Sequence, residues 1–144
     1  MTGMDILKPV VVLAAWTMVM WLWMYATRIP AINALPKSDD PSADVGWTGA
    51  KLEGLIKPSI QWKAHNYNHL HEAPTVFYAI AIVLAVIGQG DGLNAQLGWA
   101  YVALRVIHSL VQAILNKVTL RFALFAMSSL VLMALVVRAF LVMF

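Results

Sequence analysis

The sequence predicts an all-α integral membrane protein, a bundle of four transmembrane helices, and three observations indicate this fold class. Of its 144 residues, 61% are hydrophobic and only 12% are charged, whereas soluble domains carry about 25% charged residues. Four long apolar segments follow one another along the chain, with polar stretches between them. Polar residues recur inside two of these segments at spacings of three and four, which is the periodicity of a helix face.

The whole chain, 1–144, is expected to form a single domain whose four spans cover approximately residues 8–30, 58–88, 95–116 and 118–144. A helix needs roughly 20 residues to cross the hydrocarbon core, and the four segments meet this length. Pro58 suits the first turn of the second span. Pro74 is expected to kink that span beside Glu72, because proline removes a backbone donor. Residues 31–57 are polar and form the one long loop.

Basic residues indicate how the bundle is oriented in the membrane. The second loop has no Lys or Arg, whereas the first loop with its flanks and the third connection hold seven: Arg28, Lys37, Lys51, Lys57, Lys63, Lys117 and Arg121. The positive-inside rule therefore predicts that loops one and three are cytoplasmic and that both termini lie on the opposite side. The basic residues are scattered singly, so no nucleic-acid partner is expected. The chain has no cysteine, which excludes disulfides, thiolate metal sites and cysteine nucleophiles.

Two polar stripes run along the second and third expected spans. The first polar stripe is Gln61, His65, Asn68 and Glu72; the second polar stripe is Arg105, His108, Gln112 and Asn116. Hydrocarbon penalises such residues, by roughly 2.5–3.5 kcal/mol for an arginine at the centre of a membrane helix. The stripes are therefore expected to face protein or water, and to mark the functional site.

Glu72 and Arg105 are the sharpest pair in these stripes. One interpretation is an interhelical ion pair that only fixes the geometry of the bundle. Another is that Arg105 also offers its guanidinium to a ligand carboxylate, and the two are compatible. His65, His69 and Glu72 have the spacing of a metal-ligand face, but the chain contains no second histidine-rich segment. A hydrogen-bonding or lipid-headgroup role is favoured for them, and no metal is expected.

The remaining candidates also have two interpretations each. An unperturbed histidine has a pKa near neutrality, so His108 either acts as a general acid or base or makes a satisfied polar contact. Gln112 and Asn116 either bind amide groups of a ligand or bridge helices. Arg28 and Arg121 lie at the cytoplasmic ends of the first and fourth spans. They either extend to the membrane interface or, together with Arg105, surround one anionic ligand that enters from the cytoplasmic side.

The segment NHLHEAPTVFYA at residues 68–79, followed by RVIHS at 105–109 and then by Asn116 and Arg121, resembles the MAPEG superfamily. These are membrane-associated proteins in eicosanoid and glutathione metabolism, and the chain is most similar to bacterial members. The resemblance covers nearly the whole chain: four spans, a long first loop, an Asn/Glu second helix and an arginine-containing third helix. It implies an integral protein of a bacterial inner membrane.

The resemblance further implies a homotrimer that contacts membrane lipid and binds glutathione, as co-substrate, at its subunit interfaces. By position, Asn68 and Glu72 match the helix-two Asn and Glu of the family, and Arg105 and His108 match the helix-three Arg and its neighbour. Arg121 matches the helix-four arginine associated with activation of the glutathione thiol, which makes it the expected catalytic residue. The implied cofactor-binding residues are Arg28, His65, Asn68, Glu72, Arg105, His108, Gln112 and Asn116.

The function implied is a membrane-bound glutathione transferase or peroxidase that acts on a hydrophobic small-molecule electrophile. A guanidinium beside the thiol would lower its pKa and so favour the nucleophilic thiolate. Asn68 and Glu72 are four apart here and three apart in the eukaryotic enzymes. Gln112 stands where a tyrosine is common, and Phe122 and Phe125 stand where several active members have hydroxyls. These departures motivate an alternative function, a non-catalytic lipid-binding or accessory membrane subunit of the same fold.

Overall fold

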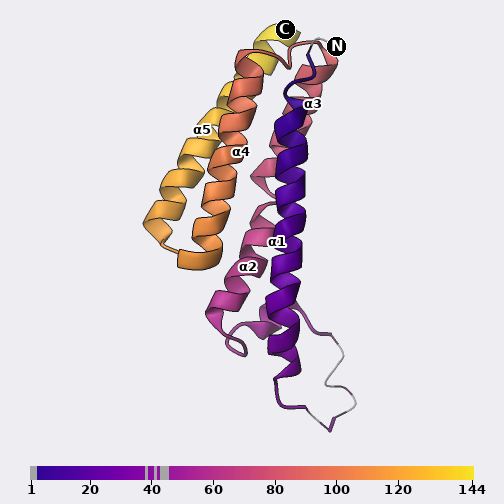
Figure 1. The fold of residues 1–144 in the computed structure, drawn as a ribbon, viewed down its shortest axis with the longest axis vertical. Helices are drawn as coiled ribbons and strands as arrows, with labels where there is room; N and C mark the ends of the chain where they lie inside the picture. The colour runs from indigo at the N-terminus through magenta and orange to yellow at the C-terminus, as the bar shows by residue number, and fades with distance from the viewer. Residues whose placement is uncertain (1–2, 38, 41, 43–45) are drawn as a thin grey trace.

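The computed structural model describes residues 3–37, 39–40, 42 and 46–144. Over these residues the regular structure is entirely helical: α1 (Leu7–Asn33), η1 (Gly49–Leu52), α2 (Pro58–His69), α3 (Ala73–Val86), α4 (Leu93–Leu110), η2 (Val111–Leu115) and α5 (Val118–Met143). The element η1 is a single 3₁₀ turn, and η2 is a π-helical turn that continues α4. The long helices run along one common direction, with both termini at one end of the bundle and the long first loop at the other (Figure 1).

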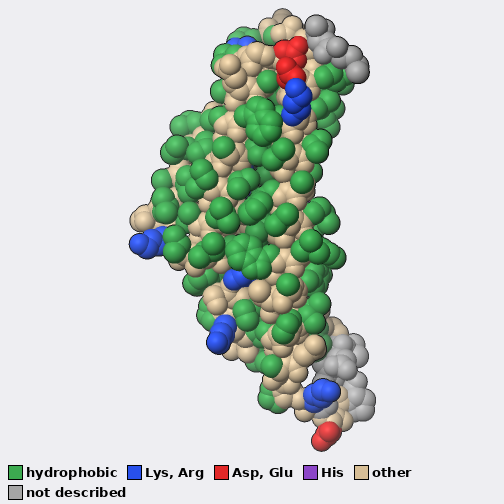
Figure 2. Space-filling model, viewed as in Figure 1, with side chains coloured by type: hydrophobic (Ala, Val, Ile, Leu, Met, Phe, Trp, Pro, Cys, Tyr) green, Lys and Arg blue, Asp and Glu red, His purple; other side chains and the backbone are tan. Residues whose placement is uncertain are grey.

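Four helical segments are long and apolar enough to cross a membrane: α1, α2 with α3, α4 with η2, and α5. The face drawn in Figure 2 is hydrophobic over most of its length, and its acidic side chains are confined to the two ends. Apolar side chains that stay exposed along a bundle are stable in lipid. The predicted fold class, an all-α membrane protein with four spans, is confirmed.

The second span differs from the expected kinked helix, because it is interrupted at residues 70–72. Helix α2 ends at His69, and α3 begins at Ala73 with Pro74 in its first turn. Pro74 has no N–H to bond the carbonyl four residues earlier, and its ring clashes with that carbonyl, so the helix stops. The hydroxyl of Thr75 donates to the carbonyl of Glu72 at 2.6 Å. The break displaces Glu72 from the helical line of His65 and Asn68.

Helix α1 forms the centre of the packing, against α2 on one side and α4 on another, while α5 packs on α4 and α3. Its buried residues recur every three or four positions: Pro9, Leu13, Thr17, Met20 and Met24. The helix continues through Pro30 to Asn33, three residues beyond its expected end. In the core, the rings of Phe77 on α3 and Tyr101 on α4 stack with their centroids 4.5 Å apart.

One buried hydroxyl joins three helices. Ser109 on α4 accepts a hydrogen bond at 2.9 Å from the indole Nε1 of Trp16 on α1. It also accepts from the Nδ2 of Asn66 on α2. Ser109 is 0% exposed and Asn66 is 1% exposed, so water does not replace either bond. These three residues, the Ser109 cluster, fix the rotation of α1, α2 and α4 around their axes.

Replacing Ser109 with alanine is expected to lower the free energy of unfolding by about 2 kcal/mol, since two buried donors lose their acceptor. Thermal unfolding in detergent, followed by circular dichroism, measures this loss. Ser129→Ala is the matched control, because Ser129 is half-buried on α5 and its side chain has no hydrogen bond among the described residues. Equal unfolding temperatures for the two variants would contradict a structural role for the Ser109 cluster.

The start of the chain is fastened to the second loop. The backbone amides of Gly3 and Asp5 both donate to the carboxylate of Asp91, the latter at 3.2 Å. These bonds lower the pKa of Asp91 below its usual value. The amide of Ile6 also donates to the carbonyl of Gly90 at 2.9 Å. A Cβ at Gly90 would lie 1.9 Å from the carbonyl oxygen of Gly3, so only glycine allows this approach.

Candidate functional site

A cavity of about 400 Å³ lies between α2, the α4–η2 segment and α5. We call it the stripe cavity, because both polar stripes contribute to it. Its lining residues are His65, His69, Glu72, His108, Gln112, Val118, Arg121, Phe122 and Phe125. Five of the nine residues predicted for the site therefore line one cavity: His65, Glu72, His108, Gln112 and Arg121. Its volume lies within the range of roughly 300–1,000 Å³ that small-molecule sites occupy.

Helix α5 supplies the stripe cavity with an apolar wall and with one cation, Arg121. Val118, Phe122 and Phe125 follow one another at spacings of four and three, so they share one face of the helix. Arg121 lies on the same face between them. Its Nη1 donates to the Oδ1 of Asn116, which ends η2 in a left-handed conformation with φ 49° and ψ 32°. Asn116 therefore stands beside the cavity and orients Arg121.

The opposite wall of the stripe cavity is polar and mostly buried. His108 is 2% exposed and Gln112 is 7% exposed. The Nδ1 of His108 and the Oε1 of Gln112 have no hydrogen-bond partner among the described residues. Buried polar atoms are rarely left unpaired, so these two atoms give the wall unused hydrogen-bonding capacity, which side-chain rotation would turn toward a ligand. Gln112 is presented by the π-helical turn η2, and such turns are frequent at functional sites.

His69, considered from the sequence only as a metal ligand, lies at the centre of the cavity wall. Its Nδ1 is 2.8 Å from the Oε2 of Glu72. Its ring centroid is 5.2 Å from that of His108 and 5.7 Å from that of Phe125. It therefore connects the polar wall to the aromatic one. The spacing of four from His65 was the only signal in the sequence that singled it out.

The predicted ion pair between Glu72 and Arg105 is not formed. Both residues belong to the described part of the chain, and no ion pair joins them there. Arg105 is 1% exposed and lies behind the cavity wall, with its Nη2 donating to the carbonyl of His69 at 3.3 Å. Glu72 contacts the ring of His69 instead, because the break after His69 turns the carboxylate of Glu72 toward that ring. The Nε and Nη1 of Arg105 have no partner among the described residues.

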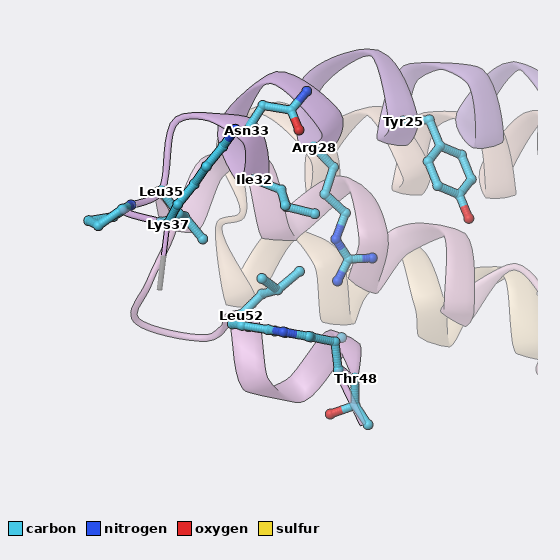
Figure 3. Close-up of a pocket in the computed structure, with 11 residues that line it drawn as sticks. Tyr25, Arg28, Ile32, Asn33, Leu35, Lys37, Thr48 and Leu52 are labelled. Carbon is cyan, nitrogen blue, oxygen red and sulfur yellow. The ribbon is translucent and has the colours of Figure 1, made fainter. Parts of the chain in front are cut away.

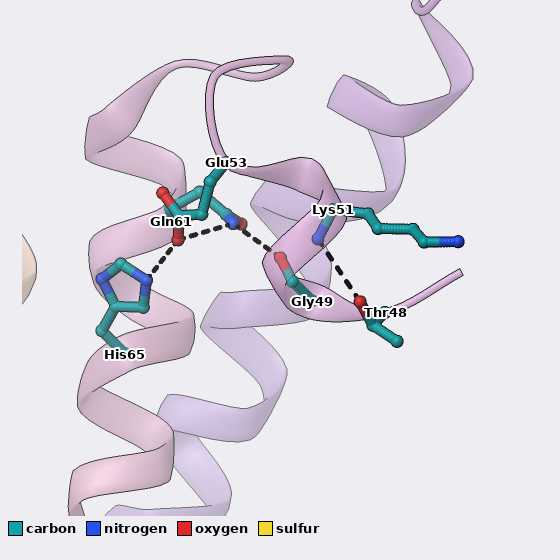
Figure 4. A network of polar contacts seen from close by, with 6 residues as sticks. All are labelled: Thr48, Gly49, Lys51, Glu53, Gln61 and His65. Carbon is teal, nitrogen blue, oxygen red and sulfur yellow. Dashed lines mark hydrogen bonds and ion pairs between the residues drawn. The ribbon is translucent and has the colours of Figure 1, made fainter. Parts of the chain in front are cut away.

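The beginning of the first polar stripe binds the long loop (Figure 4). The Nε2 of His65 lies 2.6 Å from the Oε1 of Glu53, and the Nε2 of Gln61 donates to the same oxygen at 3.2 Å. Gln61 also donates to the carbonyl of Gly49 at 3.2 Å. Glu53 was missed from the sequence, since nothing in its polar surroundings distinguishes it. Asn68 is exposed and does not line the stripe cavity.

Arg28 lies in a different place from the other predicted site residues. It contributes to a second cavity of about 640 Å³ between the end of α1 and η1, which we call the loop-one cavity (Figure 3). Its lining residues are Tyr25, Arg28, Ile32, Asn33, Leu35, Pro36, Lys37, Trp47, Thr48, Gly49 and Leu52. Within one chain, Arg28 and Arg121 are thus not brought to one ligand. The two cavities share no lining residue. Helices α1 and α2 extend beyond the turn that joins η2 to α5 (Figure 1).

Comparison with known proteins supports the arrangement of the whole chain. A family model described as MAPEG family matches residues 6–141, from the first turn before α1 to the last turn of α5. The match therefore includes both polar stripes and every residue that lines the two cavities. Comparisons with curated proteins and with solved structures return no match.

Proposed function

The chain belongs to the MAPEG family, and on this premise we propose that it is a membrane-bound glutathione-dependent transferase or peroxidase acting on hydrophobic electrophiles. Membership makes it a membrane protein of the group that serves eicosanoid and glutathione metabolism. The observation that supports the specific activity is the position of Arg121, in a cavity with one polar and one aromatic wall. Such a cavity suits a reaction between a polar thiol and an apolar partner.

The polar wall offers groups that match glutathione, a tripeptide with an ammonium, two carboxylates, two amides and a thiol. The carboxylate of Glu72 is an acceptor for the ammonium. His108 and Gln112, whose Nδ1 and Oε1 have no partner among the described residues, would bind the peptide groups after their side chains rotate toward the cavity. The guanidinium of Arg121 is left for the thiol. An adjacent cation lowers the pKa of a thiol from about 8.5 and so raises the fraction of thiolate at neutral pH.

The aromatic wall is suited to the second substrate. Val118 and Phe122 are each 69% exposed on the outside of the bundle, and the half-buried Phe125 continues this apolar surface into the cavity. An electrophile dissolved in the bilayer would reach Arg121 along this wall without crossing water. This explains in physical terms why the reaction would take place in a membrane protein, since apolar substrates concentrate in lipid.

The proposed assembly is a homotrimer. Asn68 is exposed and the side chain of Glu72 is 65% exposed in a single chain, although both lie on a span. Polar residues in contact with lipid are costly, so a second copy that covers them would stabilise the assembly. The proposed location is a bacterial inner membrane. The distribution of Lys and Arg supports an orientation with loops one and three cytoplasmic and both termini on the opposite side.

Glutathione titration tests the proposal directly. The purified protein in lipid nanodiscs is expected to bind glutathione by isothermal titration calorimetry and to develop the ultraviolet absorbance of a thiolate. It is also expected to conjugate glutathione to a chlorinated aromatic acceptor. A glutathione analogue without the thiol is the control, which should bind without any thiolate signal. Absence of both binding and turnover at cellular glutathione concentrations would overturn the proposal.

The second candidate, a lipid-binding or accessory subunit, rests on the exposed ring of Phe122, which no described residue covers. This reading predicts that the protein co-purifies with another subunit or a tightly held lipid and shows no thiolate signal. Native mass spectrometry from mild detergent separates the two functions. A bare homo-oligomer that generates the thiolate supports the enzyme and excludes the accessory role.

A further inference from the structure

We propose that the loop-one cavity is a second ligand site, which binds the phosphate headgroup of an anionic phospholipid at the membrane surface. Within one chain this site shares no lining residue with the stripe cavity, so we propose it as separate from the glutathione chemistry. Five properties of the cavity support it: its charge, an unpaired donor, its apolar walls, its position along the bundle and its preformed far wall.

The charge of the loop-one cavity is positive. Arg28 and Lys37 both line it, and none of its described lining residues is acidic. Arg28 forms no ion pair with any residue in the described part of the chain, and its buried Nε has no hydrogen-bond partner there. A guanidinium with free donors in a partly enclosed space is the arrangement that binds phosphate oxygens. The side chain of Arg28 points from α1 toward η1, across the space between them (Figure 3).

The walls of the cavity indicate an amphiphile and not a free ion. Tyr25, Ile32 and Leu35 line it from the α1 side, and Leu52, which is 6% exposed, lines it from η1. A free phosphate ion gains nothing from contact with apolar walls, whereas the glycerol and first acyl carbons of a phospholipid bury apolar surface against them. Apolar area removed from water contributes about 25 cal/mol per Å² to such binding.

The position of the cavity along the bundle fits a headgroup. Arg28 lies in the last two turns of α1, the helix that ends the first span at Asn33. The headgroup region of a bilayer adjoins this end of the span, and basic pockets at the ends of transmembrane helices recognise anionic headgroups. Arg28 therefore occupies the depth at which a phosphate is found.

The far wall of the cavity is preformed. Element η1 is held to α2 by the bond from Gln61 to the carbonyl of Gly49, and its first turn is capped by the side chain of Thr48, which accepts from the amide of Lys51. Gly49 leaves the room that Arg28 uses, because a Cβ there would lie 3.0 Å from the Nη2 of Arg28. A preformed wall lowers the entropy cost of binding.

Native mass spectrometry of the full chain, released from vesicles of phosphatidylglycerol and phosphatidylcholine in equal parts, tests the proposal. The wild type is expected to retain phosphatidylglycerol about tenfold over phosphatidylcholine, the ratio that one charge-assisted contact of about 1.4 kcal/mol gives. Arg28→Ala is expected to abolish this preference. Lys57→Ala is the matched control: it removes one exposed loop-one cation outside the cavity and should retain the preference.

Three outcomes would overturn the site. Equal loss of preference in Arg28→Ala and Lys57→Ala would show general attraction between the basic loop and the membrane. Displacement of the lipid by inorganic phosphate alone would show a free-ion site. A loss of glutathione affinity in Arg28→Ala would show that Arg28 belongs to the glutathione site. Failure of the wild type to bind glutathione would refute the proposed function but would not affect the lipid experiment.

A second variant keeps the test independent of the stability of Arg28→Ala. Gly49→Val retains the cation but fills the cavity next to the Nη2 of Arg28. It is expected to lose the retained phosphatidylglycerol with no change in net charge. Retention of the lipid by this variant would place the binding elsewhere and refute the proposal.

Discussion

Replacing Arg121 with alanine is expected to lower glutathione turnover about 30-fold at neutral pH, the ratio between a fully ionised thiol and one whose pKa is about 8.5. The cause would be the thiol. Without the guanidinium, its pKa returns to about 8.5 and only a few per cent is thiolate at neutral pH. Arg121→Lys should recover part of the rate, because it keeps the charge and loses the planar fork.

The dependence of the Arg121 effect on pH separates thiol activation from simple damage. Wild-type turnover should be flat above its lowered thiol pKa, whereas turnover by Arg121→Ala should keep rising until about pH 8.5. Stopped-flow absorbance of the thiolate and steady-state rates across pH measure the two profiles. Lys117→Ala, which removes an exposed cation four residues earlier, is the control and should leave the profile unchanged. Parallel profiles in wild type and Arg121→Ala would exclude the proposed role.

Replacing Arg105 with methionine is expected to stabilise the protein by about 1–4 kcal/mol and to weaken glutathione binding several-fold. Arg105 is 1% exposed, and its single hydrogen bond, to the carbonyl of His69, leaves Nε and Nη1 unpaired. Methionine fills a similar volume without the cost of burying a charge. The loss of binding follows because a positive charge directly behind the cavity wall disappears. A protein that keeps a costly charge beside a site exchanges stability for function.

Two measurements on the same preparations test the Arg105 prediction: the thermal unfolding midpoint in detergent and the calorimetric affinity for glutathione. Arg105→Lys keeps the charge and is the matched control, with little change expected in either quantity. A lower unfolding midpoint for Arg105→Met would show that the guanidinium is paired in the assembled protein and stabilises the contact between helices. Unchanged affinity would show that its charge does not reach the ligand.

Much of the fold was predictable, because the signals that define it are long. An apolar run of about 20 residues has few alternatives to a membrane helix, and the expected four spans were found. The details at prolines were less predictable. Pro30 lies inside α1, whereas Pro74 follows a complete break in the second span. Proline allows either outcome, and the choice depends on tertiary contacts that the sequence does not display.

The candidate site was predictable as a constellation but not in its pairing. Periodicity brought His108 and Gln112 into one wall, and the structure places them together. The predicted pairing of Glu72 with Arg105 was wrong. The break at residues 70–72 changes the direction of the Glu72 side chain and places His69 between Glu72 and Arg105. Arg28 could not be assigned to a cavity from the sequence, since helix length and loop folding together determine which space it enters.

The fastening of the first residues to the second loop has a practical consequence for producing this protein. Ile6 is fully buried, and the carbonyl of Gly3 fits against Gly90 with no room for a side chain. A purification tag or reporter fused directly before Gly3 would therefore disturb the packing of Gly3 against Gly90. Phe144, at the other end, is 94% exposed. An affinity handle or fluorescent fusion placed after Phe144 would meet no such packing.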